Sequence, residues 1–80
     1  MNPWTLYILK CRDNSLYTGI TTDLEKRLKC HSDGKASKCT RSRLPVKLMY
    51  SKRYRSESAA RKEEARIKNL PRSEKLKIIK

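Results

Sequence analysis

Four side chains in the first 31 residues could transfer protons and bind phosphate. Tyr7 and Tyr17 lie in two short runs typical of β-strands, and Arg27 and His31 lie one helical turn apart in the segment that follows. Phenol and imidazole groups can exchange protons, and a guanidinium binds phosphate oxygens. The chain also carries a formal net charge of +13. Together these features favour chemistry on phosphodiester bonds over simple adhesion.

The charge balance indicates a partner that is a polyanion. The chain has 21 Lys and Arg residues against 8 Asp and Glu residues. Nucleic acid is the leading candidate, with DNA favoured over RNA. An anionic membrane is the competing partner, but no segment is long enough to span a bilayer and the N-terminus does not resemble a signal peptide. We therefore expect a cytoplasmic protein that does not bind membranes, and the sequence leaves its oligomeric state open.

The length of 80 residues predicts a single small domain spanning residues 1–80. Hydrophobic and charged residues each make up 36% of the chain, so the core must be thin. The three cysteines, Cys11, Cys30 and Cys39, are odd in number and lack paired spacing, which argues against a disulfide framework. A zinc site that combines them with His31 is disfavoured, because Cys30 and His31 are adjacent and would point in different directions on a helix.

The first elements predicted along the chain are two paired strands and a helix. Residues 4–9 and 16–20 are rich in β-branched and aromatic side chains, and residues 12–15 predict the turn of a hairpin. Thr22 and Glu25 have the spacing of a capping box, which predicts a helix that starts at about residue 23. The Asp33-Gly34 pair predicts its end. In this helix, Leu24 and Leu28 should face the sheet.

The rest of the chain predicts a basic loop, a third strand and two helices. Residues 34–43 form the loop, and the alternating apolar positions of residues 46–50 indicate a half-buried strand. Residues 56–70 predict a helix whose apolar face contains Ala59, Ala60, Ile67 and Leu70, and Pro71 begins a last short helix. The basic side chains expected to contact phosphates are Lys26, Lys35, Lys38, Arg41 and Arg43.

With Thr5-Leu6-Tyr7 and Tyr17-Thr18-Gly19 on paired strands and nine residues between the tyrosines, the chain resembles the GIY-YIG nuclease family. Thr5, Leu6 and Thr18 differ from the Gly, Ile and Ile that are usual in the two motifs, whereas the tyrosines and Gly19 match. Residues 19–28, 40–45 and 64–68 also look like the small stand-alone bacterial members. The resemblance covers nearly the whole chain and implies an α+β fold, a three-stranded antiparallel sheet flanked by helices in the order β-β-α-β-α-α.

The resemblance also implies a role for each site residue. Tyr17 would activate the attacking water, and Tyr7 would assist it. Arg27 would stabilise charge on the phosphate, Glu64 would hold one divalent metal, Mg²⁺ or Mn²⁺, and His31 could orient a group or relay a proton. These roles are physically consistent, because a phenol with an ordinary pKa near 10 needs a nearby cation to act as a base. The implied activity is metal-dependent endonuclease cleavage of nucleic acid.

Each of these residues also has a structural explanation. Strand tyrosines commonly pack, Arg27 could be a solvated surface residue, His31 could cap a helix end, and Glu64 could pair with Lys68. Two alternative functions therefore stay open: a nucleic-acid-binding module with weak or no catalysis, and an interaction module for an acidic protein. Metal-dependent strand breaks that a chelator stops would distinguish the nuclease from the binding module. Competition tests the acidic-protein module, since excess nucleic acid should displace an acidic partner only if both use one face.

Overall fold

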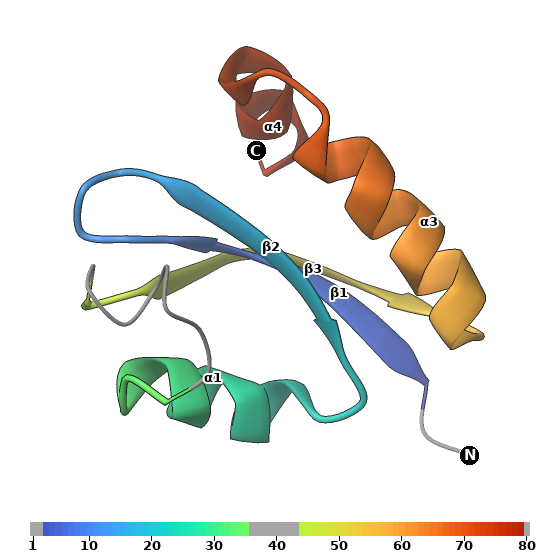
Figure 1. Ribbon diagram of the computed structural model, residues 1–80, viewed down its shortest axis with the longest axis horizontal. Coiled ribbons are helices and arrows are strands. Elements are labelled where there is room, and N and C mark those ends of the chain that lie inside the picture. Colours follow the sequence, from blue (N-terminus) through green and yellow to red (C-terminus); the bar gives the residue numbers. More distant parts are fainter. Residues whose placement is uncertain (1–2, 36–43, 80) are drawn as a thin grey trace.

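The computed structural model describes residues 3–35 and 44–79, and its elements follow the predicted order of strand, strand, helix, strand, helix and helix (Figure 1). The elements are β1 (Trp4–Lys10), β2 (Leu16–Thr21), α1 (Leu24–Ser32), β3 (Lys47–Tyr54), α3 (Glu57–Lys68) and α4 (Arg72–Ile78). The predicted α+β fold is confirmed. Within the described residues, no helix is both long and apolar enough to cross a membrane.

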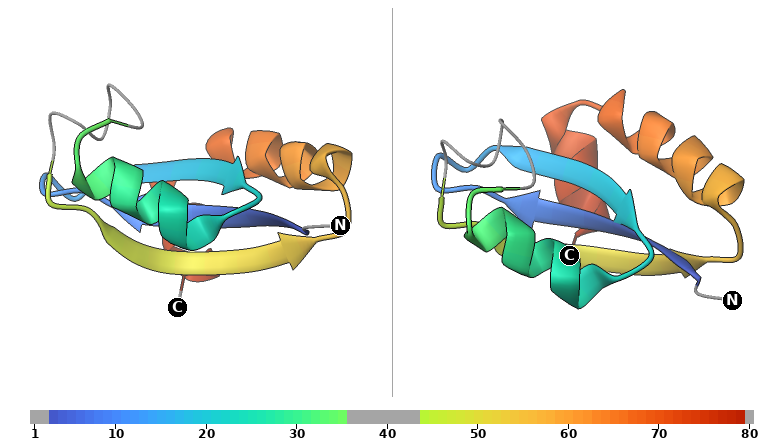
Figure 2. Two further views of the ribbon diagram at one scale, coloured as in Figure 1. Left: turned by 90° about the horizontal axis from the view of Figure 1, so that it is seen from below. Right: turned by 60° about the horizontal axis from the view of Figure 1, so that its bottom comes forward.

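The three strands form one antiparallel sheet in the order β2-β1-β3. Helix α1 covers one face of this sheet, and α3 and α4 cover the other, as the two views in Figure 2 show. The central strand is therefore buried on both faces, and Leu6, Ile8 and Leu9 are each 0% exposed. Because side chains alternate along a strand, β1 supplies two different environments.

The face under α3 and α4 holds the hydrophobic core. Leu6 and Ile8 of β1 pack there with Ile67 of α3, and Tyr50 and Leu70 are among the half-buried residues around them. Thr5, Tyr7 and Leu9 alternate with these residues and lie on the face under α1. The core cluster thus lies on one side of the sheet, and the other side combines the buried Tyr7 and Leu9 with polar groups such as Thr5.

Helix α1 begins one residue later than the capping-box pattern predicted. The N-cap is Asp23, not Thr22, and its Oδ1 accepts a hydrogen bond from the backbone N–H of Lys26 at 3.1 Å. Thr21 Oγ1 in turn accepts from the Asp23 N–H at 3.1 Å. Thr22 and Asp23 are adjacent, and Asp is at least as favourable an N-cap as Thr. The Thr22–Glu25 pattern therefore misplaces the helix start by one residue. The predicted end is confirmed, because Gly34 follows the helix with φ 75°.

The third strand is longer than the predicted segment of residues 46–50. It spans Lys47–Tyr54 because its backbone stays paired with β1 as far as Trp4, although residues 51–53 are polar and exposed. An irregularity between Ile8 and Leu9 shifts the register, so that Leu48 lies opposite Leu9 while Tyr50 lies opposite Ile8. Leu48 is consequently 37% exposed, and the simple apolar alternation fails there.

Helix α3 matches the prediction at its start and ends two residues early. Ser56 is the N-cap, and its Oγ accepts from the Ala59 N–H at 3.2 Å. Ala60 and Ile67 are buried against the sheet, as predicted. Leu70 lies beyond the helix but still packs on the core. The last helix, α4, starts directly after Pro71 as expected.

Thr18 carries a buried hydroxyl without a hydrogen-bond partner among the described residues. Its side chain is 3% exposed and lies opposite Ile8 on the core face. Thr18→Val keeps the shape and removes the unsatisfied oxygen, so the free energy of unfolding should rise by about 1–3 kcal/mol. Thermal melting measures this, since each kcal/mol shifts the midpoint by roughly 4–8 °C in a domain of this size.

Thr21→Val is the matched control for Thr18→Val. Thr21 is also buried, but its hydroxyl is hydrogen-bonded to the Asp23 backbone. Removing it should lower stability by about 0.5–1.5 kcal/mol. A Thr18→Val variant that melts at or below the wild-type temperature would show that the orphan hydroxyl carries no penalty.

Candidate active site

Tyr7 and His31 form a buried hydrogen-bonded pair between β1 and α1. Tyr7 Oη lies 3.0 Å from His31 Nε2, and the two residues are 2% and 1% exposed. The strand period turns Tyr7 toward α1, and the helical turn after Arg27 turns His31 toward the sheet. His31 is therefore not the exposed helix-end group that its position allowed.

The surroundings of this pair fix its protonation. Burial raises the pKa of Tyr7 well above its ordinary value; the charges of Tyr17 and Glu64 add to the rise, and Arg27 opposes it. Burial and then Arg27 lower the pKa of His31 below 6.5. At neutral pH Tyr7 keeps its proton and His31 is neutral, so the Tyr7 hydroxyl can donate to Nε2. This pair orients groups and does not carry charge.

Tyr17 completes an aromatic cluster with this pair, as the predicted hairpin required. Its ring centroid lies 6.3 Å from that of Tyr7 and 5.1 Å from that of His31. Tyr17 is opposite Leu9 in the sheet, which makes it a diagonal neighbour of Tyr7. Unlike Tyr7 it is only half-buried, so its hydroxyl side is more accessible to water or substrate.

Gly19 lies opposite Tyr7 in the sheet register, and its role is to leave space. A Cβ atom at this position would lie 2.6 Å from Tyr7 Oη and 2.8 Å from Tyr7 Cζ. Such contacts are shorter than packed carbon and oxygen atoms allow, and the Tyr7 ring is held by β1 and by His31. The ring therefore fits between α1 and the sheet only because residue 19 has no side chain.

Gly19→Ala is expected to displace the Tyr7 hydroxyl and break its hydrogen bond to His31. Overpacking of this kind costs about 1–3 kcal/mol of stability. Chemical denaturation measures the loss, and the imidazole resonances of His31 should shift by NMR. An unchanged His31 signal in Gly19→Ala would contradict the steric role.

Arg27 and Lys26 line a hollow of about 470 Å³ beside α1, together with Thr21, Thr22, Asp23 and Cys30. Both basic residues are exposed. The Arg27 charge nevertheless reaches the buried pair, since it lowers the pKa values of Tyr7 and His31. Lys35 is exposed after α1, and the predicted phosphate contacts Lys38, Arg41 and Arg43 lie outside the described residues. The hollow thus offers two cations to an anionic group.

Glu63 and Glu64 of α3 have different surroundings. Glu63 accepts two hydrogen bonds from Arg66, at 2.9 and 2.7 Å, and this pairing is the main cause that lowers the pKa of Glu63. Glu64 Oε2 lies 3.3 Å from Lys68 Nζ, so the expected i,i+4 pair does form. Glu64 also raises the pKa of Tyr7, which Glu63 does not. Of the two carboxylates, Glu64 is therefore the one whose charge affects the pKa of a tyrosine in the cluster.

These residues fit a metal ion that keeps most of its water. Among residues 3–35 and 44–79, no group of three or more His, Cys, Asp or Glu residues is placed to hold a metal. The site thus offers a single carboxylate, Glu64, whose side chain is 20% exposed. Mg²⁺ commonly binds through one or two carboxylates and completes its shell with water and substrate phosphate. A fully liganded structural zinc site does not match this donor set.

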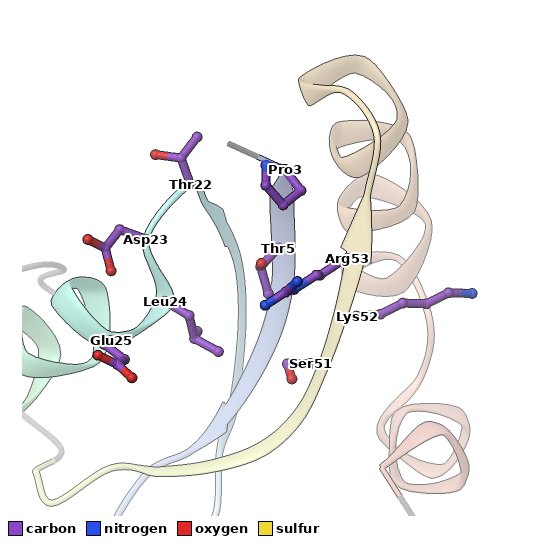
Figure 3. Close-up of a pocket in the computed structure, with 9 residues that line it drawn as sticks. All are labelled: Pro3, Thr5, Thr22, Asp23, Leu24, Glu25, Ser51, Lys52 and Arg53. Carbon is purple, nitrogen blue, oxygen red and sulfur yellow. The ribbon is translucent and has the colours of Figure 1, made fainter. Parts of the chain in front are cut away.

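A second hollow, of about 500 Å³, lies between the start of α1 and the strands β1 and β3, and sequence analysis did not anticipate it (Figure 3). We name it the α1–β3 cavity. Its lining residues are Pro3, Thr5, Thr22, Asp23, Leu24, Glu25, Ser51, Lys52 and Arg53. In Figure 3 the side chain of Arg53 points from β3 toward Thr5, whereas that of Lys52 points away.

The lowered pKa of His31 makes stability depend on pH in a defined window. The unfolded chain binds a proton near pH 6.5, which the folded state resists, so the free energy of unfolding should fall as pH drops below about 6.5. The slope is at most about 1.4 kcal/mol per pH unit. Urea denaturation between pH 7 and 5 measures it. His31 is the one histidine in the chain, so His31→Gln should flatten this profile. An equal slope in both proteins would refute the assignment.

The fold and the tyrosine cluster define a class of protein: a small basic α+β domain with two strand tyrosines beside an arginine-bearing helix. The GIY-YIG catalytic domain model matches residues 3–77, and the chain belongs to this family. It is 55% identical over 74 residues to a UPF0213 protein of Oceanobacillus iheyensis, covering 92% of this chain and 86% of the relative. It is 49% identical over 78 residues to one of Streptococcus agalactiae, covering 98% and 89%.

Two solved structures are similar to the chain over nearly its whole length. The solution NMR structure of a UPF0213 protein from Bacillus halodurans matches with a TM-score of 0.63 at 39% identity, covering 96% of this chain and 82% of that one. An NMR structure of a protein from E. faecalis matches with a TM-score of 0.66 at 36% identity, covering 94% and 80%. The names of these relatives give no specific function.

Proposed function

We propose that this protein is a metal-dependent endonuclease that hydrolyses phosphodiester bonds in nucleic acid, with DNA as the preferred substrate. The observation that carries the proposal is the convergence of three elements on Tyr7. His31 of α1 bonds to its hydroxyl, the Tyr17 ring of β2 lies 6.3 Å away, and the charges of Arg27 and Glu64 both act on its pKa. Membership of the GIY-YIG family supports the same activity.

The environments of the two tyrosines divide their roles. Tyr7 is buried and its pKa is raised, so it suits a donor that positions its neighbours and not a base. Tyr17 is half-buried at the edge of the cluster and is the tyrosine that can reach a water molecule. In the proposed reaction the water oxygen bonds to phosphorus as its proton passes to the Tyr17 oxygen, the proton of the Tyr17 hydroxyl passes to solvent, and the bond between phosphorus and the sugar oxygen breaks. The departing oxygen takes a proton from solvent.

The cations of the site stabilise the charge that this reaction develops. Arg27 and Lys26 line the hollow beside α1, where a phosphate would bind, and Arg27 would lower the energy of the pentavalent phosphate. Glu64 would hold the divalent metal. When bound there, Mg²⁺ or Mn²⁺ would neutralise negative charge on the phosphate and on the leaving oxygen. Lys68 pairs with Glu64, so this ion pair would have to break when the metal binds.

A cleavage assay tests the proposal directly. Purified protein is incubated with labelled duplex, branched and single-stranded DNA and with the matching RNAs, in Mg²⁺, in Mn²⁺ and in excess chelator. We expect chain breaks that depend on the metal and stop with the chelator, and faster cutting of at least one DNA than of its RNA counterpart. Binding without cleavage on every substrate would instead support a nucleic-acid-binding module.

A further inference from the structure

The α1–β3 cavity contains opposite charges that do not neutralise each other. The Arg53 side chain on β3 makes no ion pair or hydrogen bond within the described part of the chain, and neither does the Glu25 side chain on α1. Both line the same cavity of about 500 Å³, a volume typical of small-ligand sites. A cation and a carboxylate that face one cavity without touching can both bind a ligand that bears acceptors on one edge and donors on another.

The floor of the cavity adds a hydroxyl. Thr5 is 9% exposed and lines the cavity, and its hydroxyl has no hydrogen-bond partner among residues 3–35 and 44–79. Thr5 lies opposite Arg53 in the sheet, and Ser51, a further lining residue of β3, lies opposite Tyr7. The cavity floor is therefore continuous with the strand positions that hold the tyrosine cluster.

The lining favours a nucleobase over a phosphate. Glu25, which does not line the hollow of Lys26 and Arg27, places a carboxylate on the α1 side of this cavity, and its charge would repel a phosphate group. Asp23 is already committed to the helix cap, so Glu25 is the available acceptor. Pro3 and Leu24 supply apolar surface against which the face of a flat ring can pack, and Figure 3 shows Leu24 directed from α1 toward the strands.

Among the bases, guanine best matches this donor and acceptor pattern. Arginine binds the adjacent O6 and N7 acceptors of guanine through two parallel hydrogen bonds. Guanine also carries the adjacent N1–H and N2–H donors, which a carboxylate such as Glu25 can accept. We propose that the α1–β3 cavity binds one unpaired guanine base of a nucleic-acid strand. The inference deepens the proposed function, because it assigns that nuclease a preference for substrates with an accessible guanine.

Binding to a set of matched oligonucleotides tests the inference. Fluorescent oligo(dT) strands that carry a single central dG, dA or dC are titrated with protein in excess chelator, so that no cleavage occurs. The dG strand should bind roughly 5- to 150-fold more tightly than plain oligo(dT), the range of one good bidentate pair. The dA and dC strands should not. Equal affinity for all four strands would overturn the inference.

Substitutions at two neighbouring positions of β3 test whether the preference for dG arises at Arg53. Arg53→Lys keeps the positive charge but loses the planar pair of donors, so the preference for dG should disappear while affinity for oligo(dT) stays within about twofold. Lys52→Gln is the matched control, because Lys52 points away from the cavity; it should weaken all strands equally and keep the preference. A dG preference that survives in Arg53→Lys would place the guanine elsewhere and refute the site.

A ligand titration separates this inference from the proposed function. In ¹H–¹⁵N NMR spectra, guanosine monophosphate should shift the backbone signals of Thr5, Ser51 and Arg53, and thymidine monophosphate should not. If these signals shift but no substrate is ever cut, the cavity is a guanine site and the nuclease proposal fails. If metal-dependent cleavage occurs but the signals and the dG preference are absent, the nuclease proposal holds and the guanine inference fails.

Discussion

Replacing Tyr17 with Phe is expected to lower the rate of metal-dependent cleavage by about 10²- to 10⁴-fold, the usual contribution of a general base. The change removes one hydroxyl and keeps the ring, whose centroid lies 5.1 Å from that of His31. Packing in the cluster should therefore persist, and the melting temperature should stay close to that of the wild type. Single-turnover cleavage measures the rate, and circular dichroism checks the fold.

Substitutions of Tyr7 and Tyr50 test whether the loss of cleavage rate is specific to Tyr17. Tyr7→Phe removes the hydrogen bond to His31, so it should cost about 0.5–1.5 kcal/mol of stability but a smaller factor in rate than Tyr17→Phe. Tyr50 packs on the opposite face of the sheet, and Tyr50→Phe should keep the wild-type rate. A larger loss of rate in Tyr7→Phe than in Tyr17→Phe would transfer the role of base to Tyr7.

The parts of the site that depend on neighbouring residues could be predicted from the sequence. A strand alternates its side chains and a short turn fixes the hairpin, so the spacing of Tyr7 and Tyr17 was enough to bring their rings together. The turn itself is held locally, since Asp13 Oδ1 accepts from the Ser15 N–H at 3.0 Å and Asn14 adopts φ 70°. Errors in this part amount to one residue at the end of each strand and one at the start of α1.

The parts that depend on distant pairing could not be predicted in the same way. The extension of β3 comes from backbone bonds to β1, which polar residues such as Lys52 and Arg53 do not signal in sequence. The α1–β3 cavity arises because the register places Arg53 opposite Thr5, far away in the chain. The burial of His31 likewise depends on how α1 docks over Tyr7, which its own helix does not reveal.

Gly19 shows how a motif residue can be recognised before its physical role is known. The sequence shows only that Gly19 matches the motif; its φ is not positive, and the requirement is space for the Tyr7 ring. Thr18, beside it, departs from the usual isoleucine and leaves a hydroxyl buried in the core. The two neighbours therefore differ in kind: Gly19 is constrained by the site on one face of β2, and Thr18 weakens the core on the other.

Glu64→Gln should abolish metal-dependent cleavage and leave nucleic-acid affinity equal or tighter. The side chains are nearly isosteric, but the amide cannot supply the negative charge that a divalent ion requires. Removing a carboxylate also removes repulsion of phosphate, so affinity measured in excess chelator should not fall. Cleavage rates at increasing Mg²⁺ and Mn²⁺ and a binding titration give the two quantities separately.

Glu63→Gln is the matched control, since it makes the same change one residue away on the same helix. Glu63 pairs with Arg66 and acts on Tyr54, whereas Glu64 acts on Tyr7. The pair is partly exposed, so its loss should cost no more than about 1 kcal/mol and leave cleavage unchanged. If Glu63→Gln stopped cleavage and Glu64→Gln did not, the metal ligand would be Glu63. The electrostatic link between Glu64 and Tyr7 would then affect only the protonation of that tyrosine.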